Sequence, residues 1–235
     1  MEFAQEELDK MVAGHKDFLE SFKNKAKKIR LIGKDLRGAD LSQSDLRSAE
    51  FTGANLENAN LSGADLRGAV FCKANLKRAD LRGANIEKAN MNGANLCDAY
   101  LENARLDDVK LPGAKLMNSD LREAKLKLAY LDGADLTNAD LKNAYMAGIQ
   151  LEGANLSGAE LQGANLKGAN LKGANLQNAR LQGAILTGAN LIGANLENSI
   201  YEGNDVRGVH VTPKQLETAD ILLKIQILDQ NPFEE

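Results

Sequence analysis

The chain has 235 residues and a net charge of −4 at pH 7, a length that allows one or two domains. No stretch approaches the roughly 18 consecutive apolar residues of a membrane span, so we expect no membrane segment. No long apolar segment follows a basic cluster at the N-terminus, so the sequence predicts no signal peptide.

Residues 3–24 are predicted to form an amphipathic helix within an N-terminal helical cap at residues 1–30. We expect this helix to cover the first leucines of the repeat that follows. Its apolar residues recur at three-four spacing: Leu8, Met11, Val12, His15, Phe18, Leu19 and Phe22. The basic cluster between Lys23 and Arg30 is short, has acidic neighbours and lacks aromatic residues, so we expect no direct contact with nucleic acid.

From Leu31 to Leu196, every fifth residue is leucine or a similar apolar residue, usually with alanine two positions before it. A step of five gives no apolar stripe on an α-helix and alternates between the faces of a flat strand. Residues two apart, however, share one face of an extended segment. We therefore predict a single solenoid over residues 31–211, with short extended sides that point alanine and leucine inward and with corners between them.

The corners are expected at the glycine or asparagine two positions after each leucine, because both residue types adopt positive φ readily. Large side chains indicate that four sides make one coil of twenty residues. These are Phe51, Phe71 and Met91 in place of the leucine, and Val109, Ile149 and Val209 in place of the alanine, all on one face. Coils that stack at about 4.8 Å then give a rod of about eight coils.

The segment ADLSQSDLRSAEFTGANLENANLSGADLRGA follows the pattern A(D/N)LxG and resembles the pentapeptide-repeat protein family. The resemblance extends from residue 31 to about 210 and implies an all-β fold, a right-handed quadrilateral parallel β-helix. The preceding HKDFLES resembles a leader found in many bacterial members of the family, which implies a bacterial protein. The small position departs from the pattern at Lys34, Ser44, Val109, Ser119, Ile149 and Ser199.

Residues 212–235 are predicted to form a C-terminal helical cap. Thr212 is the expected N-cap, Pro213 the first helical residue and Gln215 the capping-box partner. The helix has more apolar residues than one buried face needs, so we predict a homodimer through the C-terminal helices. The alternative is a helix that the tail of its own chain covers. The expected dimer residues are Leu216, Ile221, Leu222, Leu223, Ile225 and Leu228.

The sequence indicates no catalytic, cofactor or metal site. His15 and His210 fall at opposite ends of the predicted rod, and the repeat glycines do not have the spacing of a phosphate-binding loop. The Asp and Asn residues before the leucines lack the pattern of calcium-binding β-rolls, so we expect them to hydrogen-bond at the corners. Cys72 and Cys97 fall on different faces at outward positions, which predicts two free thiols and favours a reducing, cytoplasmic compartment.

The predicted function is that of a non-enzymatic scaffold that binds an unknown protein partner through its outer faces. Twenty-residue stacking places Arg105, Lys125 and Tyr145 in one outward column with Lys127 beside it. This column is either a partner patch or a solvated column with a cation–π contact. The regular units from 151 to 195 are interpreted as plain scaffold.

The family resemblance also implies an alternative, a modulator that binds DNA gyrase or topoisomerase as a mimic of DNA. One predicted face is acidic, but basic residues share it. A mimic of a duplex, with one charge per ~1.7 Å, is expected to be more uniformly acidic. The acidic residues of this face are Asp40, Asp80, Asp120, Asp140 and Glu160, and the basic ones are Arg82, Arg122, Lys142 and Arg180.

Overall fold

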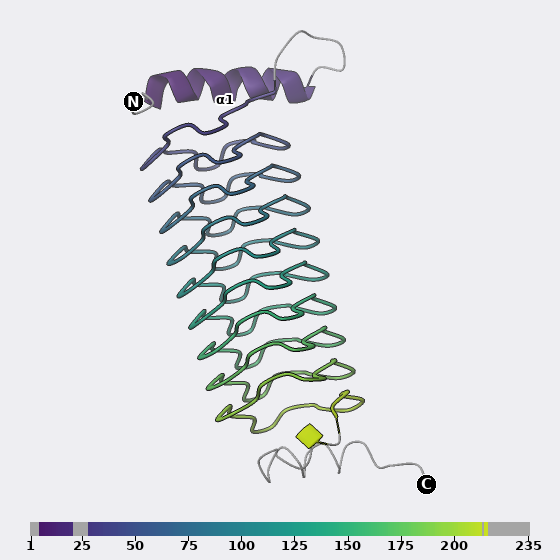
Figure 1. Ribbon diagram of the computed structural model, residues 1–235. Coiled ribbons are helices and arrows are strands. Elements are labelled where there is room, and N and C mark those ends of the chain that lie inside the picture. Colours follow the sequence, from purple (N-terminus) through teal and green to yellow (C-terminus); the bar gives the residue numbers. More distant parts are fainter. Residues whose placement is uncertain (1–4, 21–27, 213, 216–235) are drawn as a thin grey trace.

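The computed structural model describes residues 5–20, 28–212 and 214–215, and it consists of one helix and a stack of coils (Figure 1). The helix, α1 (Gln5–Glu20), lies across one end of the stack. The coils follow one another along the chain, from the coil beside α1 to the far end of the stack, as the change of colour from purple to yellow shows (Figure 1).

Parallel β-bridges join each residue before a leucine to the residue twenty positions later. They run in steps of five from Arg30↔Glu50 to Asn190↔His210. Twenty residues contain four of the five-residue units, which is the coil length that the spacing of the large side chains predicts. Each side contributes one bridge residue, so the described residues form isolated bridges and no longer strand.

A tight turn forms each corner. In the unit that begins at Leu46, the Ala49 N–H donates to the Leu46 carbonyl at 3.0 Å, and Ser48 between them has φ +61°. A positive φ at the third turn residue is the mark of a type II turn, where glycine or asparagine is preferred. Several corners nevertheless carry other residues in this conformation, among them Lys73, Glu123 and Leu128.

The interior of the coils is filled by the repeated apolar residues. The central residues from Leu31 to Leu186 are at most 2% exposed, and most of the inward alanines are fully buried. The Phe51 and Phe71 rings stack with their centroids 4.6 Å apart and their planes 3° from parallel. That spacing is close to the distance between paired strands, so equivalent side chains of successive coils lie directly above one another.

Helix α1 packs on the first coil through its apolar side and through side-chain hydrogen bonds. Leu8 is buried in the core. The Gln5 amide donates to the Asp40 carbonyl at 2.8 Å, and the Asp40 N–H donates back to Gln5 Oε1 at 3.1 Å. The first coil has no earlier coil to bond with, so Gln5 closes part of an otherwise open backbone edge.

At the other end, the Gln215 amide bonds to the backbone of the last coils. Its Nε2 donates to the Leu191 carbonyl at 2.7 Å and its Oε1 accepts from the Gly193 N–H at 3.1 Å. The Gln215 N–H donates to Thr212 Oγ1 at 3.2 Å, and the Thr212 N–H donates to Gln215 Oε1 at 2.9 Å. These reciprocal bonds confirm the predicted capping box.

Pro213 and the predicted dimer residues Leu216, Ile221, Leu222, Leu223, Ile225 and Leu228 lie outside the described residues. The homodimer through the C-terminal helices therefore stays a prediction. The mass in solution of the full chain and of a chain without residues 213–235 tests it.

Both cysteines are free thiols, as the sequence predicts. Cys97, at the position after Leu96 that was expected to face outward, is nevertheless buried, while Cys72 is half-buried. Burial raises the pKa of the Cys97 thiol. Corner residues of adjacent coils lie above one another at each corner, and such stacking covers a side chain as small as cysteine.

Leu128 occupies a corner with φ +57° and is 47% exposed. An L-residue with a large side chain in this conformation is strained by about 1–2 kcal/mol. We expect Leu128→Asn to raise the free energy of unfolding by up to about 1 kcal/mol, since asparagine tolerates positive φ. Denaturant unfolding followed by circular dichroism measures the change. The matched control is the reverse replacement at an equivalent corner, Asn178→Leu, which should lower the free energy of unfolding. A lower free energy of unfolding in Leu128→Asn would contradict the strain argument.

Candidate protein-interaction surface

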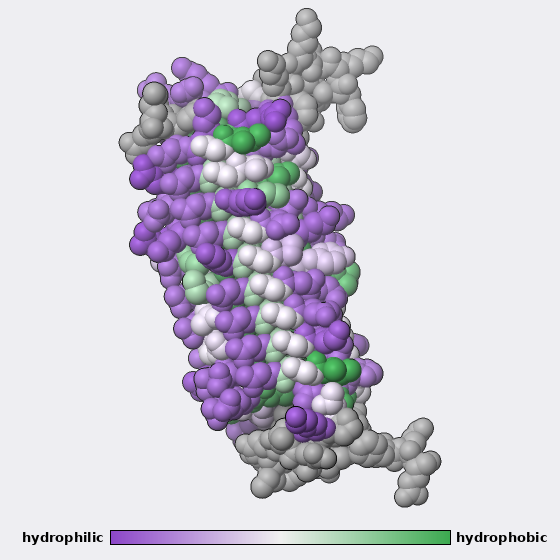
Figure 2. All heavy atoms as spheres, viewed as in Figure 1, coloured by the Kyte–Doolittle hydropathy of each residue, from purple (hydrophilic) through white to green (hydrophobic). Residues whose placement is uncertain are grey.

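The face of the coils seen in Figure 2 is mostly hydrophilic, with a few hydrophobic side chains on it. No helix in the described part of the chain is long and apolar enough to cross a membrane. Within residues 5–20, 28–212 and 214–215, no group of three or more His, Cys, Asp or Glu residues is arranged to hold a metal ion.

The Asp and Asn residues before the leucines hydrogen-bond at the corners, as predicted. Asp40 Oδ1 accepts from the Ser42 N–H at 3.0 Å, and Asn60 Oδ1 accepts from the Ser62 N–H at 3.1 Å. Asparagines of successive coils are also linked, since Asn75 Nδ2 donates to Asn55 Oδ1 at 2.9 Å. These side chains are therefore used to build the coil.

Four of the five named acidic residues of this face are paired with cations, whereas Asp40 accepts from the Ser42 N–H. Arg82 binds Asp80 through two nitrogens at 2.9 and 2.5 Å, and Arg122 binds Asp120 in the same way at 2.8 and 2.6 Å. These hydrogen bonds lower the pKa values of Asp80 and Asp120. Further along the face, Lys142 bridges Asp140 and Glu160, and Arg180 pairs with Glu160. The face thus presents alternating charges and not a uniformly negative surface.

The predicted column of Arg105, Lys125 and Tyr145 forms one ladder of the structure. Parallel bridges join Arg105 to Lys125 and Lys125 to Tyr145, and the ladder continues through Asn165 to Ile185. We call these five residues the basic-aromatic column. All of them occupy the outward position before a central residue, on the same face of the coil.

Charges along the column are unevenly satisfied. The Arg105 guanidinium forms an ion pair with Glu87. In the described part of the chain, no hydrogen bond or ion pair involves the Lys125 ammonium, the Lys127 ammonium or the Tyr145 hydroxyl. The Tyr145 ring has no ring contact among those residues either, so the predicted alternative of a cation–π contact is not observed there. Tyr145 is 55% exposed.

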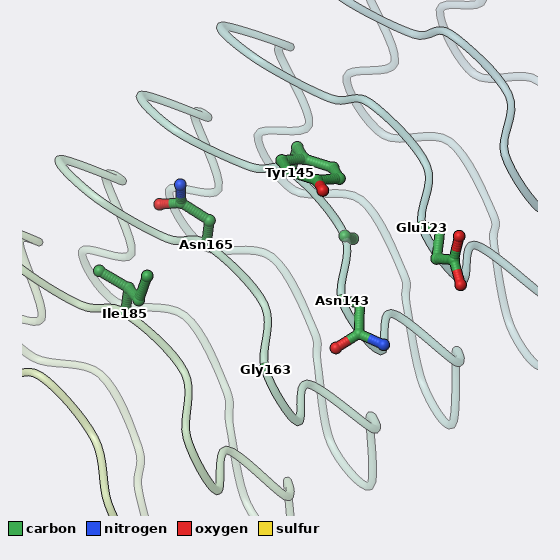
Figure 3. A pocket seen from close by; sticks show the side chains of 7 residues that line it. Glu123, Asn143, Tyr145, Gly163, Asn165 and Ile185 are labelled. Carbon is green, nitrogen blue, oxygen red and sulfur yellow. The ribbon is translucent and has the colours of Figure 1, made fainter.

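A groove of about 420 Å³ lies beside the distal part of the column (Figure 3). Tyr145 and Ile185 line it two coils apart, and Asn165 lies between them. Gly163 has no side chain at the adjacent corner, and Glu123 and Asn143 complete the rim. In the ladder, the smaller Asn165 separates the large Tyr145 and Ile185, which leaves a hollow between the two large side chains.

Sequence reasoning identified the basic end of this surface but not the groove. The sequence interprets residues 151–195 as plain scaffold, and Gly163, Asn165 and Ile185 of this stretch line the groove. The sequence did contain a signal for the groove. Ile185 is the one apolar residue before a leucine in that stretch, and it falls in the same twenty-residue register as Tyr145.

Comparison with protein families supports the repeat assignment. A family model described as pentapeptide repeats matches in eight copies. The matched residues are 29–63, 49–87, 59–98, 99–138, 134–173 and 164–200. A search of curated proteins found no match.

Two solved structures are similar to the chain. One is HetL from the cyanobacterium Nostoc sp. strain PCC 7120, a pentapeptide repeat protein involved in heterocyst differentiation regulation. It is 35% identical over 77% of this chain and 86% of its own, with a TM-score of 0.51. The other is trypsin-treated QnrB1, a plasmid-mediated fluoroquinolone resistance protein, at 18% identity over 87% of this chain and 98% of its own, with a TM-score of 0.63. The likeness to QnrB1 shows the fold alone.

Proposed function

The chain belongs to the pentapeptide repeat family, whose members form right-handed β-helices, and from this we propose that it is a non-enzymatic scaffold that binds a protein partner. The basic-aromatic column carries the proposal. It brings an exposed tyrosine together with lysines that have no partner among the described residues, on one continuous outer surface. Tyrosine is enriched at the centres of protein interfaces.

The relation to HetL supports a binding role. HetL is described as involved in regulation, and a regulator can act by binding another protein without chemical change. We propose that this protein acts in the same general way, in the cytoplasm and as a homodimer. The shared fold does not imply that this protein and HetL bind the same partner, because function depends on the surface residues that a fold carries.

The alternative of a gyrase- or topoisomerase-directed DNA mimic has less support. Asp80, Asp120, Asp140 and Glu160 of the acidic face are each paired with an Arg or Lys, whereas a duplex carries one negative charge per ~1.7 Å without such pairing. A gyrase supercoiling assay with the purified chain distinguishes the scaffold proposal from the DNA-mimic proposal. Inhibition or protection of gyrase would favour the alternative.

We expect a triple variant, Arg105→Ala with Lys125→Ala and Tyr145→Ala, to lose at least tenfold of its binding to the partner that the full chain captures. The side chains point outward, so the circular dichroism spectrum and unfolding midpoint should stay close to those of the unchanged chain. Quantitative pull-down measures the captured partner.

The matched control is Lys110→Ala with Lys115→Ala and Tyr130→Ala, which removes two cations and a tyrosine from other columns. This control should keep its binding. Full binding by the first variant would reject the column as the partner site, and capture of no specific protein by the full chain would reject the scaffold role.

A further inference from the structure

The basic-aromatic column and its groove together have the features of a peptide-binding surface. We propose that they bind an extended, acidic segment of a partner protein, with an acidic residue at Lys125 and Lys127 and an apolar residue in the groove between Tyr145 and Ile185. This inference rests on the proposed scaffold function and adds the chemistry of the partner.

The charge of the surface selects an acidic occupant. The units at 124–128, 144–148 and 164–168, which are successive on this face, contain three lysines and no acidic residue. Glu123 is the one carboxylate in the groove lining. Two of the lysines, Lys125 and Lys127, have ammonium groups without a partner among the described residues, so an incoming carboxylate has no existing ion pair to displace.

The groove selects an apolar side chain. Tyr145 and Ile185 are 55% and 38% exposed, although both are large apolar residues. They lie on either side of Asn165 (Figure 3), and the Asn143 side chain lies over the neighbouring corner at Gly163. An apolar side chain that enters from outside removes both surfaces from water, which stabilises the complex by about 25 cal/mol per Å² of buried apolar surface.

The backbone of the coil does not take part in this recognition. The Tyr145 N–H donates to the Ala124 carbonyl at 2.9 Å, and the Tyr145 carbonyl accepts from the Leu126 N–H at 2.7 Å. Both groups are used between coils, so a partner strand cannot add to this face by β-augmentation. Side chains alone must hold the segment, which therefore lies along the rod across successive coils.

The coil spacing sets the spacing of the two anchors. Lys125 and Asn165 are two coils apart in one ladder, a distance of about 10 Å at ~4.8 Å per coil. A polyproline II segment rises about 3.1 Å per residue with three residues per turn, so its residues i and i+3 point the same way about 9 Å apart. The expected ligand therefore has Asp or Glu three positions from Leu, Ile or Phe.

Selection from a displayed random-peptide library tests the inference with the full chain as bait. We expect the enriched peptides to carry an acidic residue three positions from a large apolar one. The double variant Lys125→Glu with Lys127→Glu should lower the affinity for a selected peptide at least tenfold. The double variant Tyr145→Ala with Ile185→Ser should lower it at least fivefold. Reversal of Lys110 and Lys115 to Glu on other faces is the control and should have less than a twofold effect.

Enriched peptides without acidic residues, no enrichment, or binding that persists in both test variants would overturn the inference. The proposed scaffold function is tested separately from this peptide-binding inference. A protein partner that the column variants still capture leaves the scaffold role intact and rejects this surface, whereas the absence of any specific partner rejects the scaffold role itself.

Discussion

Replacement of Phe71 by alanine is expected to lower the free energy of unfolding by about 3–5 kcal/mol. Phe71 is fully buried and its ring stacks on Phe51 at 4.6 Å. The coils above and below are held at fixed spacing by backbone bonds such as the one from the Phe71 N–H to the Asn90 carbonyl, 2.7 Å long. The cavity left by the ring therefore cannot close. Denaturant unfolding followed by circular dichroism measures the loss.

The matched control is Phe71→Leu, which places the common central residue of the repeat at this position. Leucine fills most of the space, so the loss should stay below about 1.5 kcal/mol. The ratio of the two losses tests whether the interior is packed as a rigid ladder. A loss below about 1.5 kcal/mol in Phe71→Ala would mean that the coils relax around the cavity.

Docking of α1 is expected to weaken as the pH falls below about 6.5. His15 is fully buried at the contact between α1 and the first coil. Its Nε2–H donates to the Arg47 carbonyl at 2.9 Å, while its Nδ1 accepts from the Ile29 N–H at 3.1 Å. Only the neutral ring can do both, because the imidazolium has two donors and no acceptor. Burial accordingly lowers the pKa of His15 below its usual value.

The sign of the pH effect follows from that lowered pKa. The unfolded chain binds the His15 proton near pH 6.5, but the folded chain does so only at lower pH. The stability from α1 docking is thus fully present above pH 6.5 and is lost as the pH falls toward the folded pKa, by up to about 1.4 kcal/mol per pH unit. The charged groups that face the ring are Asp45, Lys28 and Arg47. Arg47 lowers the pKa of Asp45, so that carboxylate stays ionised in this range.

Unfolding by urea at pH 7.5 and pH 5.5 measures the effect. The control is His15→Gln, whose amide can also donate to one backbone group and accept from another but does not titrate. The difference in stability between the two pH values should be smaller in this variant by about the contribution of His15. Equal pH dependence of the two proteins would show that His15 does not control the docking of α1.

Local and periodic features were predictable because they depend on residues within one unit. The inward Ala–Leu pairs, the positive φ at corners such as Gly53 and Asn58, and the capping box of Thr212 and Gln215 all follow from spacings of two to five residues. The twenty-residue length of the coil was predictable from one longer spacing, the twenty positions that separate large residues such as Phe51 and Phe71.

Features that depend on the contents of adjacent coils were not predictable in the same way. Cys97 occupies an outward position but is buried, since what covers a corner comes from coils twenty residues away. Gln5 and Gln215 are ordinary polar residues in sequence, and their role in closing the open edges exists only because the chain brings them onto the end coils.

The repeat pattern alone was enough to predict a four-sided coil with a leucine interior and an outward column of Arg105, Lys125 and Tyr145. It was enough because a strict repeat assigns each residue a side and a direction. Two properties came only from the three-dimensional arrangement: the column ends in a groove between Tyr145 and Ile185, and Asp80, Asp120, Asp140 and Glu160 of the acidic face each pair with a cation. Those properties depend on the sizes and conformations of side chains that meet across coils, which periodicity does not specify.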